Sequence, residues 1–128
     1  MPVVTVVDFR TSAGRYCVPV EAAVAVRFAS GLVDLPAPRP GVVGILPADE
    51  PITVLSVLGG GRDHVLVLAA AGHTFGLLVE EVTGLRRIDN GDIGVAPDGQ
   101  DDALVCGVIS RDDGIVLVAD PARLAERL

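Results

Sequence analysis

The amino-acid sequence predicts a mainly β protein built from two small closed barrels. Short apolar runs recur at intervals of about ten residues, and Gly, Pro, Asn or Asp bounds each run. Half of the 128 residues are hydrophobic but only 3% are aromatic, so Val, Leu and Ala supply the core. Branched side chains favour strands, and tight turns with Gly at the corners are typical of closed barrels rather than of one open sheet.

Two similar segments indicate that the chain is duplicated. Residues 72–85 form an apolar stretch that breaks at Glu80 and Glu81 and then resumes. Residues 16–24 repeat its order of residue types: an aromatic residue, alternating aliphatic residues, Val-Glu and a further Val. The aromatic residues Tyr16 and Phe75 lie 59 positions apart (75 − 16).

A later pair of strands has nearly the same spacing, because Ile52 and Ile115 lie 63 positions apart (115 − 52). The sequence therefore predicts one domain over residues 1–128. We expect it to contain two interleaved barrels, a boundary near residues 59–64 and an N-terminal strand that crosses over.

The N-terminal part is predicted to begin with a hairpin of residues 3–9 and 15–18, joined by a turn at 11–14. Pro19 interrupts this hairpin. Residues 21–26 mix Ala with Val, so we expect one helical turn that passes into a strand ending near Phe28.

Gly and Pro punctuate residues 29–51, which excludes a long element there. We expect a wrapping loop with a short apolar insert at 42–46, followed by a strand at 52–58. Residues 59–63 form its turn. The Gly triplet at 59–61 lacks the Lys-Ser/Thr ending of a phosphate-binding loop, and a strand rather than a helix follows.

The second half is predicted to contain a hairpin of residues 65–70 and 74–79 and a strand at 85–88. A turn at 89–92 and a polar loop at 98–102 follow. The acids of this loop do not have the spacing of a calcium-binding EF-hand.

The C-terminal part is predicted as a hairpin of residues 104–109 and 115–119, because an Asp-Gly step lies between these strands. A short helix closes the chain. Asp120 is a good N-cap, Pro121 suits the first helical position, and Leu124 and Leu128 lie one turn apart.

Charge and composition exclude several kinds of partner. Seventeen acidic residues oppose ten basic ones, and the resulting net charge of −7 repels nucleic acid and anionic lipid. No apolar run reaches the roughly 18 residues of a membrane span, and the first residues lack the basic start of a signal peptide. We therefore expect a soluble protein that does not insert into membranes.

The candidates for chemistry are few. Cys17 and Cys106 lack Cys-x-x-Cys spacing, so we expect two small buried hydrophobic residues in a reducing compartment. His64 and His73 flank predicted turns and lack ligand spacing, so we expect solvated turn residues and no metal or cofactor. The sequence predicts a protein that is not an enzyme and acts through its surface. A small hydrolase or lyase that uses Glu80 or Glu81 with His73 is the alternative from the enzyme class.

Several segments together resemble the CheW-like domains, the coupling proteins of bacterial chemotaxis. These segments are residues 15–21 with Val24, residues 76–82, residues 106–109 and residues 113–120. The resemblance covers nearly the whole chain. It implies two SH3-like, five-stranded β-barrels around a shared core, with a short C-terminal helix.

The resemblance also implies a function. It implies a scaffold that couples a CheA-type histidine kinase to methyl-accepting chemoreceptors, in the cytoplasm at receptor arrays on the inner face of the membrane. The kinase regulatory domain is expected to dock on the first barrel, near Val24 and Val26. The cytoplasmic tip of the receptor is expected in a groove between the barrels, near Val82 and Leu85.

One segment departs from the family pattern. Members typically have Asn and Arg in the turn before the strand that corresponds to 52–58, whereas residues 44–50 of this chain place Pro47 and Asp49 there. The candidate receptor contacts in this segment are therefore Ile45, Leu46 and Asp49. Because the segment departs from the family pattern, we expect receptor binding to be altered. A divergent adaptor in a pilus, gliding-motility or other two-component pathway is the alternative function.

Overall fold

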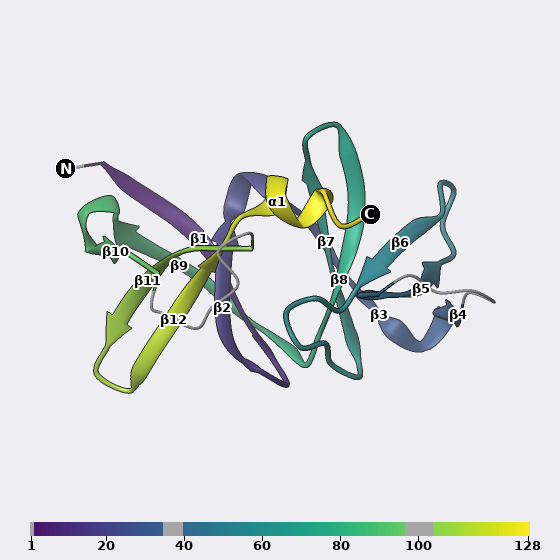
Figure 1. Ribbon diagram of the computed structural model, residues 1–128, viewed down its shortest axis with the longest axis horizontal. Helices are drawn as coiled ribbons and strands as arrows, with labels where there is room; N and C mark the ends of the chain where they lie inside the picture. The colour runs from purple at the N-terminus through teal and green to yellow at the C-terminus, as the bar shows by residue number, and fades with distance from the viewer. Residues whose placement is uncertain (1, 35–39, 97–103) are drawn as a thin grey trace.

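The computed structural model describes residues 2–34, 40–96 and 104–128, and β-strands make up most of them (Figure 1). The strands are β1 (Val3–Thr11), β2 (Gly14–Pro19), β3 (Ala23–Phe28), β4 (Val33–Asp34), β5 (Val42–Leu46), β6 (Ile52–Leu55), β7 (His64–Ala70), β8 (His73–Val79), β9 (Glu81–Asp89), β10 (Ile93–Gly94), β11 (Val105–Arg111) and β12 (Gly114–Ala119). Three 3-10 turns are η1 (Val20–Ala22), η2 (Ala29–Gly31) and η3 (Asn90–Asp92), and α1 (Pro121–Ala125) is the helix.

The strands form two sheets of the same topology. The first has the order β10-β11-β12-β2-β1-β9, and the second has the order β4-β5-β6-β8-β7-β3. Leaving aside the two-residue strands β4 and β10, each sheet has five strands, as the family resemblance implies. Each sheet curls into a barrel because β9 continues through η3 into β10, and β3 continues through η2 into β4, so that one stretch of chain joins both edges.

The two halves of the chain exchange their N-terminal hairpins. The first barrel combines β1 and β2 with β9 to β12, whereas the second combines β3 to β6 with β7 and β8. The chain therefore changes barrel after β2 and again after β8. The expected boundary at residues 59–64 separates the two sequence repeats, but residues 59–63 connect two strands of the same sheet, β6 and β7, and His64 begins β7.

The strand registers confirm the duplication. Phe9 pairs with Tyr16 in the first hairpin, and Leu68 pairs with Phe75 in the second, both shifted by 59 positions (68 − 9 and 75 − 16). The second pair of markers, predicted as Ile52 and Ile115, is offset by one residue in the structure. Ile52 pairs with Leu46, and the corresponding pair is Val116 with Ile109, so the equivalent of Ile52 is Val116 rather than Ile115.

Three apolar clusters hold the fold together. One fills the first barrel and includes Val6, Cys17 and Val116. A second fills the other barrel and includes Leu46, Val54 and Val65. The largest lies between the barrels and contains Phe9, Tyr16, Val18, Leu66, Phe75, Leu77, Leu117 and Leu124. This third cluster is the shared core that the resemblance implies.

The C-terminal helix follows its sequence signals but is short. The side chain of Asp120 accepts a hydrogen bond from the Ala122 N–H at 3.0 Å, and Pro121 is the first helical residue. Leu124 is fully buried in the shared core. The helix therefore stabilises the junction of the barrels.

Most predicted elements are confirmed, with changes in extent. The predicted hairpins are present, and the ambiguous segment at 21–26 is a 3-10 turn followed by β3. β6 ends at Leu55 because a turn follows, in which the Gly59 N–H donates to the carbonyl oxygen of Ser56 at 3.1 Å. The predicted loop at 29–51 contains β4 and β5, and the predicted polar loop at 98–102 lies outside the described residues.

The two cysteines differ. Cys17 is fully buried inside the first barrel, as predicted, whereas Cys106 is exposed, which makes that prediction wrong. The register between β11 and β12 shifts between Val105 and Gly107, and a bulge of this kind turns the intervening side chain away from the barrel. Within the described residues, no helix is both long enough and apolar enough to cross a membrane.

Candidate functional site

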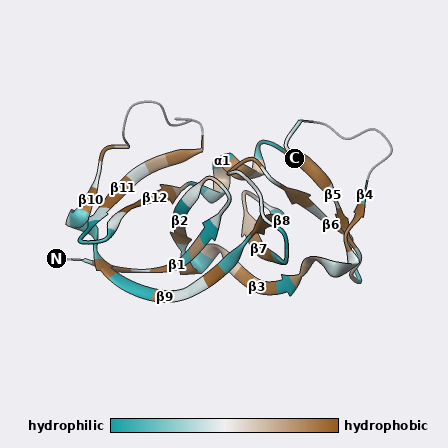
Figure 2. Ribbon diagram, turned by 90° about the horizontal axis from the view of Figure 1, so that it is seen from below, coloured by the Kyte–Doolittle hydropathy of each residue, from teal (hydrophilic) through white to brown (hydrophobic). Residues whose placement is uncertain are grey.

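An apolar groove lies between β3 of the second barrel and β9 of the first. It has a volume of about 290 Å³ and is lined by Val7, Val20, Ala23, Val24, Ala25, Val26, Leu66, Val82, Gly84 and Leu85. Both strands lie along the same side of the molecule and run in opposite directions (Figure 2). Every lining residue has an aliphatic side chain or none, so the groove accepts apolar groups.

The groove exposes large aliphatic side chains that a monomer would otherwise bury. The exposed fraction is 59% for Val24, 48% for Val26 and 68% for Leu85. Scattered exposed apolar residues are ordinary, but a contiguous set in a concave surface indicates an interaction site. Four of the seven residues selected from the sequence meet here: Val24, Val26, Val82 and Leu85.

The local structure explains why these side chains reach the surface. Among the described strands, β3 pairs only with β7 and β9 only with β1, so each has one unpaired edge. Both strands carry a register shift. In β3 the shift lies between Ala23 and Ala25. In β9 it lies between Val82 and Gly84, opposite Phe9 and Asp8 of β1. Such shifts re-aim neighbouring side chains.

The groove rests on the shared core. Leu66 and Val7 form its floor and are 1% and 5% exposed. Val20, Ala23 and Val82 pack partly against the same core. The walls are therefore held by packing on both barrels, and the groove is a preformed surface.

Charged residues border the groove at the start of each strand. Glu21 precedes β3, and Glu81 is the first residue of β9. Glu81 forms an exposed ion pair with Arg10, in which Glu81 Oε2 lies 3.3 Å from Arg10 Nη2. Glu21 is exposed and makes no ion pair within the described residues. A basic group on a bound partner would find a free carboxylate here.

The remaining three candidates lie outside the groove lining. Leu46 is 3% exposed and packs inside the second barrel, so its side chain does not reach a partner. Ile45 is half-buried on β5, and Asp49 is exposed in the turn between β5 and β6. A methyl group at Gly31 would touch Leu46 and Pro47, so η2, which follows β3, lies beside the start of this turn.

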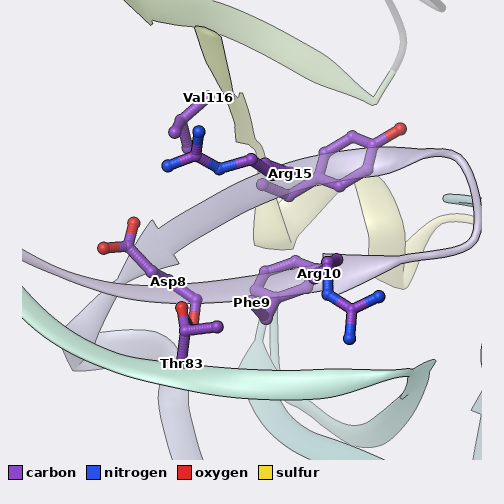
Figure 3. Close-up of a pocket in the computed structure, with 7 residues that line it drawn as sticks. Asp8, Phe9, Arg10, Arg15, Thr83 and Val116 are labelled. Atoms are coloured by element: carbon purple, nitrogen blue, oxygen red, sulfur yellow. Dashed lines mark hydrogen bonds between the residues drawn. The ribbon is translucent and has the colours of Figure 1, made fainter. Parts of the chain in front are cut away.

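A second, smaller cavity lies on the first barrel (Figure 3). It has a volume of about 160 Å³ and is lined by Asp8, Phe9, Arg10, Arg15, Tyr16, Thr83 and Val116. The rings of Phe9 and Tyr16 stack with centroids 5.9 Å apart. Arg10 forms an ion pair with Glu81 at 3.3 Å, and Arg15 forms one with Asp113 at 3.3 Å. The two arginines of this cavity therefore already hold carboxylates.

Asp8 forms the least exposed ion pair of the described residues. Its Oδ1 lies 2.9 Å from Arg86 Nη2, and the two side chains are 21% and 19% exposed. Burial raises the pKa of Asp8, although the neighbouring Arg86 charge and hydrogen bond oppose the rise. The close contact holds the carboxylate of Asp8 against the guanidinium of Arg86. The sequence offered no signal for this pair, because its members are 78 positions apart.

The groups that an enzyme would need do not converge. His73 pairs with Ala70 beside the turn of the β7–β8 hairpin, whereas Glu80 follows Val79 at the opposite end. Six strand residues separate these ends by about 20 Å. His73 is exposed, as predicted. His64 is half-buried: its Nδ1 lies 3.2 Å from the carbonyl oxygen of Glu80 and its ring contacts Phe28. The described residues contain no cluster of three metal-ligating side chains.

Comparison with known proteins gives the family. A model of the CheW-like domain matches residues 5–128. The chain belongs to the CheW-like domain family. The match covers both barrels and the C-terminal helix, so the CheW-like domain is the whole described fold.

A solved structure agrees with this assignment. The fold is similar to the crystal structure of the scaffolding protein TtCheW from Thermoanaerobacter tengcongensis, with a TM-score of 0.84 and 21% sequence identity. The alignment covers 97% of this chain and 88% of TtCheW. The structural likeness supports the CheW fold of two barrels. A search of curated proteins gives no match. As a CheW-like domain, the chain has a scaffold or adaptor role in chemotaxis signalling.

Proposed function

We propose that this CheW-like domain couples a CheA-type histidine kinase to methyl-accepting chemoreceptors, without catalysing a reaction. The apolar groove between β3 and β9 carries the proposal. It would receive the amphipathic helix of a receptor tip, since such a helix presents one apolar stripe to a groove. The partner would place basic side chains near Glu21.

Val24 and Val26, which were expected on the first barrel as kinase contacts, lie instead on β3 of the second barrel and line the groove. The kinase regulatory domain would therefore dock elsewhere on the second barrel. Phe28 at the end of β3 is 74% exposed, and Val33 on β4 is 54% exposed. Phe28 contacts the ring of His64 beside a cavity of about 460 Å³. Exposed aromatic residues are enriched at protein interfaces. A coupling protein requires two separate surfaces, because it holds both partners together.

Binding assays with the purified domain test this proposal. We would measure its affinity for the regulatory domain of the CheA-type kinase and for the signalling fragment of a chemoreceptor, both from the same cell. The proposal expects both complexes, and expects the three proteins together to form one assembly at the inner face of the membrane. Binding to neither partner would end the adaptor interpretation.

A divergent adaptor is the second candidate, and Asp49 favours it. The acidic side chain is exposed at a position where the family typically carries Arg. A reversed charge at a partner contact favours a different partner. In this case the kinase would still bind, whereas the receptor would be replaced by a component of a pilus, gliding-motility or other two-component pathway.

A further inference from the structure

The interior of the first barrel ends in charged side chains. Successive side chains of a strand point to opposite faces. On β1, Asp8 and Arg10 therefore share a face with Val6, and on β2, Arg15 shares a face with Cys17. Val6 and Cys17 belong to the apolar filling of this barrel. The charged residues thus lie where that filling stops.

The second barrel carries small or apolar residues at the equivalent positions. A shift of 59 positions (67 − 8, 69 − 10 and 74 − 15) relates Asp8, Arg10 and Arg15 to Val67, Ala69 and Thr74. Val67 is buried in the apolar cluster of its barrel. Since both sheets have the same strand topology, the fold by itself does not require charged groups at these positions.

The charged end of the first barrel contains the small cavity of Figure 3. Its volume is about 160 Å³, and a cavity of about 150 Å³ is large enough to hold a benzene ring. Phe9, Tyr16 and Val116 contribute apolar surface to its lining. The cavity therefore accommodates a small ligand whose centre is a short carbon chain.

Two arginines reach to opposite sides of this cavity. Arg10 and Arg15 face each other across the β1–β2 hairpin. Arg10 extends to Glu81 of β9, whereas Arg15 extends to Asp113, in the turn before β12. The strand order β12-β2-β1-β9 puts these two carboxylates on opposite sides of the hairpin. Figure 3 shows the same divergence, because Arg15 extends beside Val116 and Arg10 extends away from it.

Both arginines retain hydrogen-bond donors for a further anion. A guanidinium group has several N–H donors, and each of these two forms its ion pair through one nitrogen. The ion pairs around the cavity join four arginines, Arg10, Arg15, Arg86 and Arg111, to three carboxylates, Asp8, Glu81 and Asp113. Because Asp113 serves both Arg15 and Arg111, this network has one positive charge in excess.

The existing ion pairs do not block a ligand. The pairs of Arg10 and Arg15 are exposed, and exposed pairs contribute less than about 1 kcal/mol. Like charges directly opposite each other in a sheet are destabilising, and a bound anion would relieve this repulsion. The carboxylate of Asp8, which also lines the cavity, is offset by Arg86 at 2.9 Å.

We propose that the first barrel binds a small dicarboxylate in this cavity, with one carboxylate at Arg10, the other at Arg15 and the carbon chain between them. Arginine suits this role because its planar fork matches a carboxylate. The inference goes beyond the proposed function. It concerns a small ligand on a surface that lies outside the apolar groove.

A methyl NMR titration of the whole chain with succinate tests the inference. Val116 lines the cavity, and Ile52, its equivalent in the second barrel, is the internal control. We expect succinate to shift the Val116 methyl signals and to leave those of Ile52 in place. Butyrate has the same number of carbon atoms but one carboxylate, and should bind at least about tenfold more weakly at equal ionic strength. Sulfate tests for binding of a simple anion.

Arg10→Gln and Arg15→Gln should each weaken succinate binding about tenfold. Their side chains are 51% and 39% exposed, so both variants should fold. Arg27→Gln is the matched control, since Arg27 is exposed on β3 of the other barrel and outside the cavity. This control should keep its affinity within about twofold.

The assay contains neither kinase nor receptor, so its outcome is independent of the proposed function. The expected losses in both cavity variants, with Arg27→Gln unchanged, support the dicarboxylate site. No Val116 shift at about 20 mM succinate would overturn it. Equal shifts at Val116 and Ile52, or butyrate or sulfate binding as tightly as succinate, would also overturn it, because one anionic group or unspecific binding would then suffice.

Discussion

Val26 and Leu85 occupy equivalent positions in the two halves of the chain and line the same groove from opposite barrels. Val26 pairs with Leu66 on β7, and Leu85 pairs with Val7 on β1. Their partners are buried and form the groove floor, whereas their own side chains are exposed. The exchange of hairpins between the halves is what sets these two residues face to face.

Val26→Glu should weaken binding of the receptor signalling fragment at least about tenfold, because a carboxylate would face the apolar stripe of the helix. Ile115→Glu is the matched control, since Ile115 is 49% exposed, also β-branched and outside the groove. Isothermal titration calorimetry measures both affinities. An equal loss in both variants would contradict the groove as the binding surface.

Phe28→Ala should weaken binding of the kinase regulatory domain about tenfold and leave receptor binding within about twofold of wild type. Phe28 is mostly exposed and contributes little to the core, so the fold should survive. Surface plasmon resonance with each partner in turn measures the effect. Loss of receptor binding alone would assign the Phe28 surface to the other partner.

Asp49→Arg should strengthen receptor binding by about twofold to fivefold, because exposed ion pairs contribute up to about 1 kcal/mol. Glu50→Arg, in the same exposed turn, is the control for net charge. The gain should shrink at high salt. Unchanged or weaker binding would favour the divergent adaptor.

Arg86→Ala should lower the free energy of unfolding by about 2 kcal/mol, because it leaves the partly buried Asp8 carboxylate without its cation. The double change Asp8→Val with Arg86→Leu should stay within about 1 kcal/mol of wild type. The second barrel supports this, since Val67 occupies the position equivalent to Asp8 and is buried.

Denaturant unfolding monitors these variants. Arg10→Ala removes an exposed ion pair and should change stability by less than about 0.5 kcal/mol. If the double change is as destabilising as Arg86→Ala, the ion pair contributes more than an apolar pair of similar volume would.

Cys17 should make stability fall at high pH. Burial raises the pKa of this thiol to about 12, from an ordinary value of 9.0. The unfolded chain therefore loses the proton first, and stability is full below pH 9 and declines as pH rises toward 12, by about 1.4 kcal/mol per pH unit. Cys17→Ala should remove this part of the decline. Unfolding in a Cys106→Ser background isolates the effect, and identical pH profiles would contradict it.

The sequence by itself determined the strand-rich fold, the duplication and the C-terminal helix. Local preferences are enough to predict these features, because each signal acts over a few residues. The signals are apolar runs of strand length, the Gly and Pro residues between the runs, and the Asp120-Pro121 start of the helix. The same patterns indicated two closed barrels. The family resemblance added the SH3-like type of barrel and the groove-lining candidates Val24, Val26, Val82 and Leu85.

Tertiary structure alone decided which of these residues meet. The sequence led us to expect interleaved barrels with one crossing strand, whereas the structure exchanges whole hairpins. The spacing of 59 cannot specify this, because strand pairing across a long chain depends on burial and not on local propensity. Leu46 follows the same apolar pattern as Ile45 yet faces the barrel interior. Cys106 is exposed by a register shift, and Asp8 meets Arg86 across 78 positions. Contacts between distant strands fix these features, and they fix the groove.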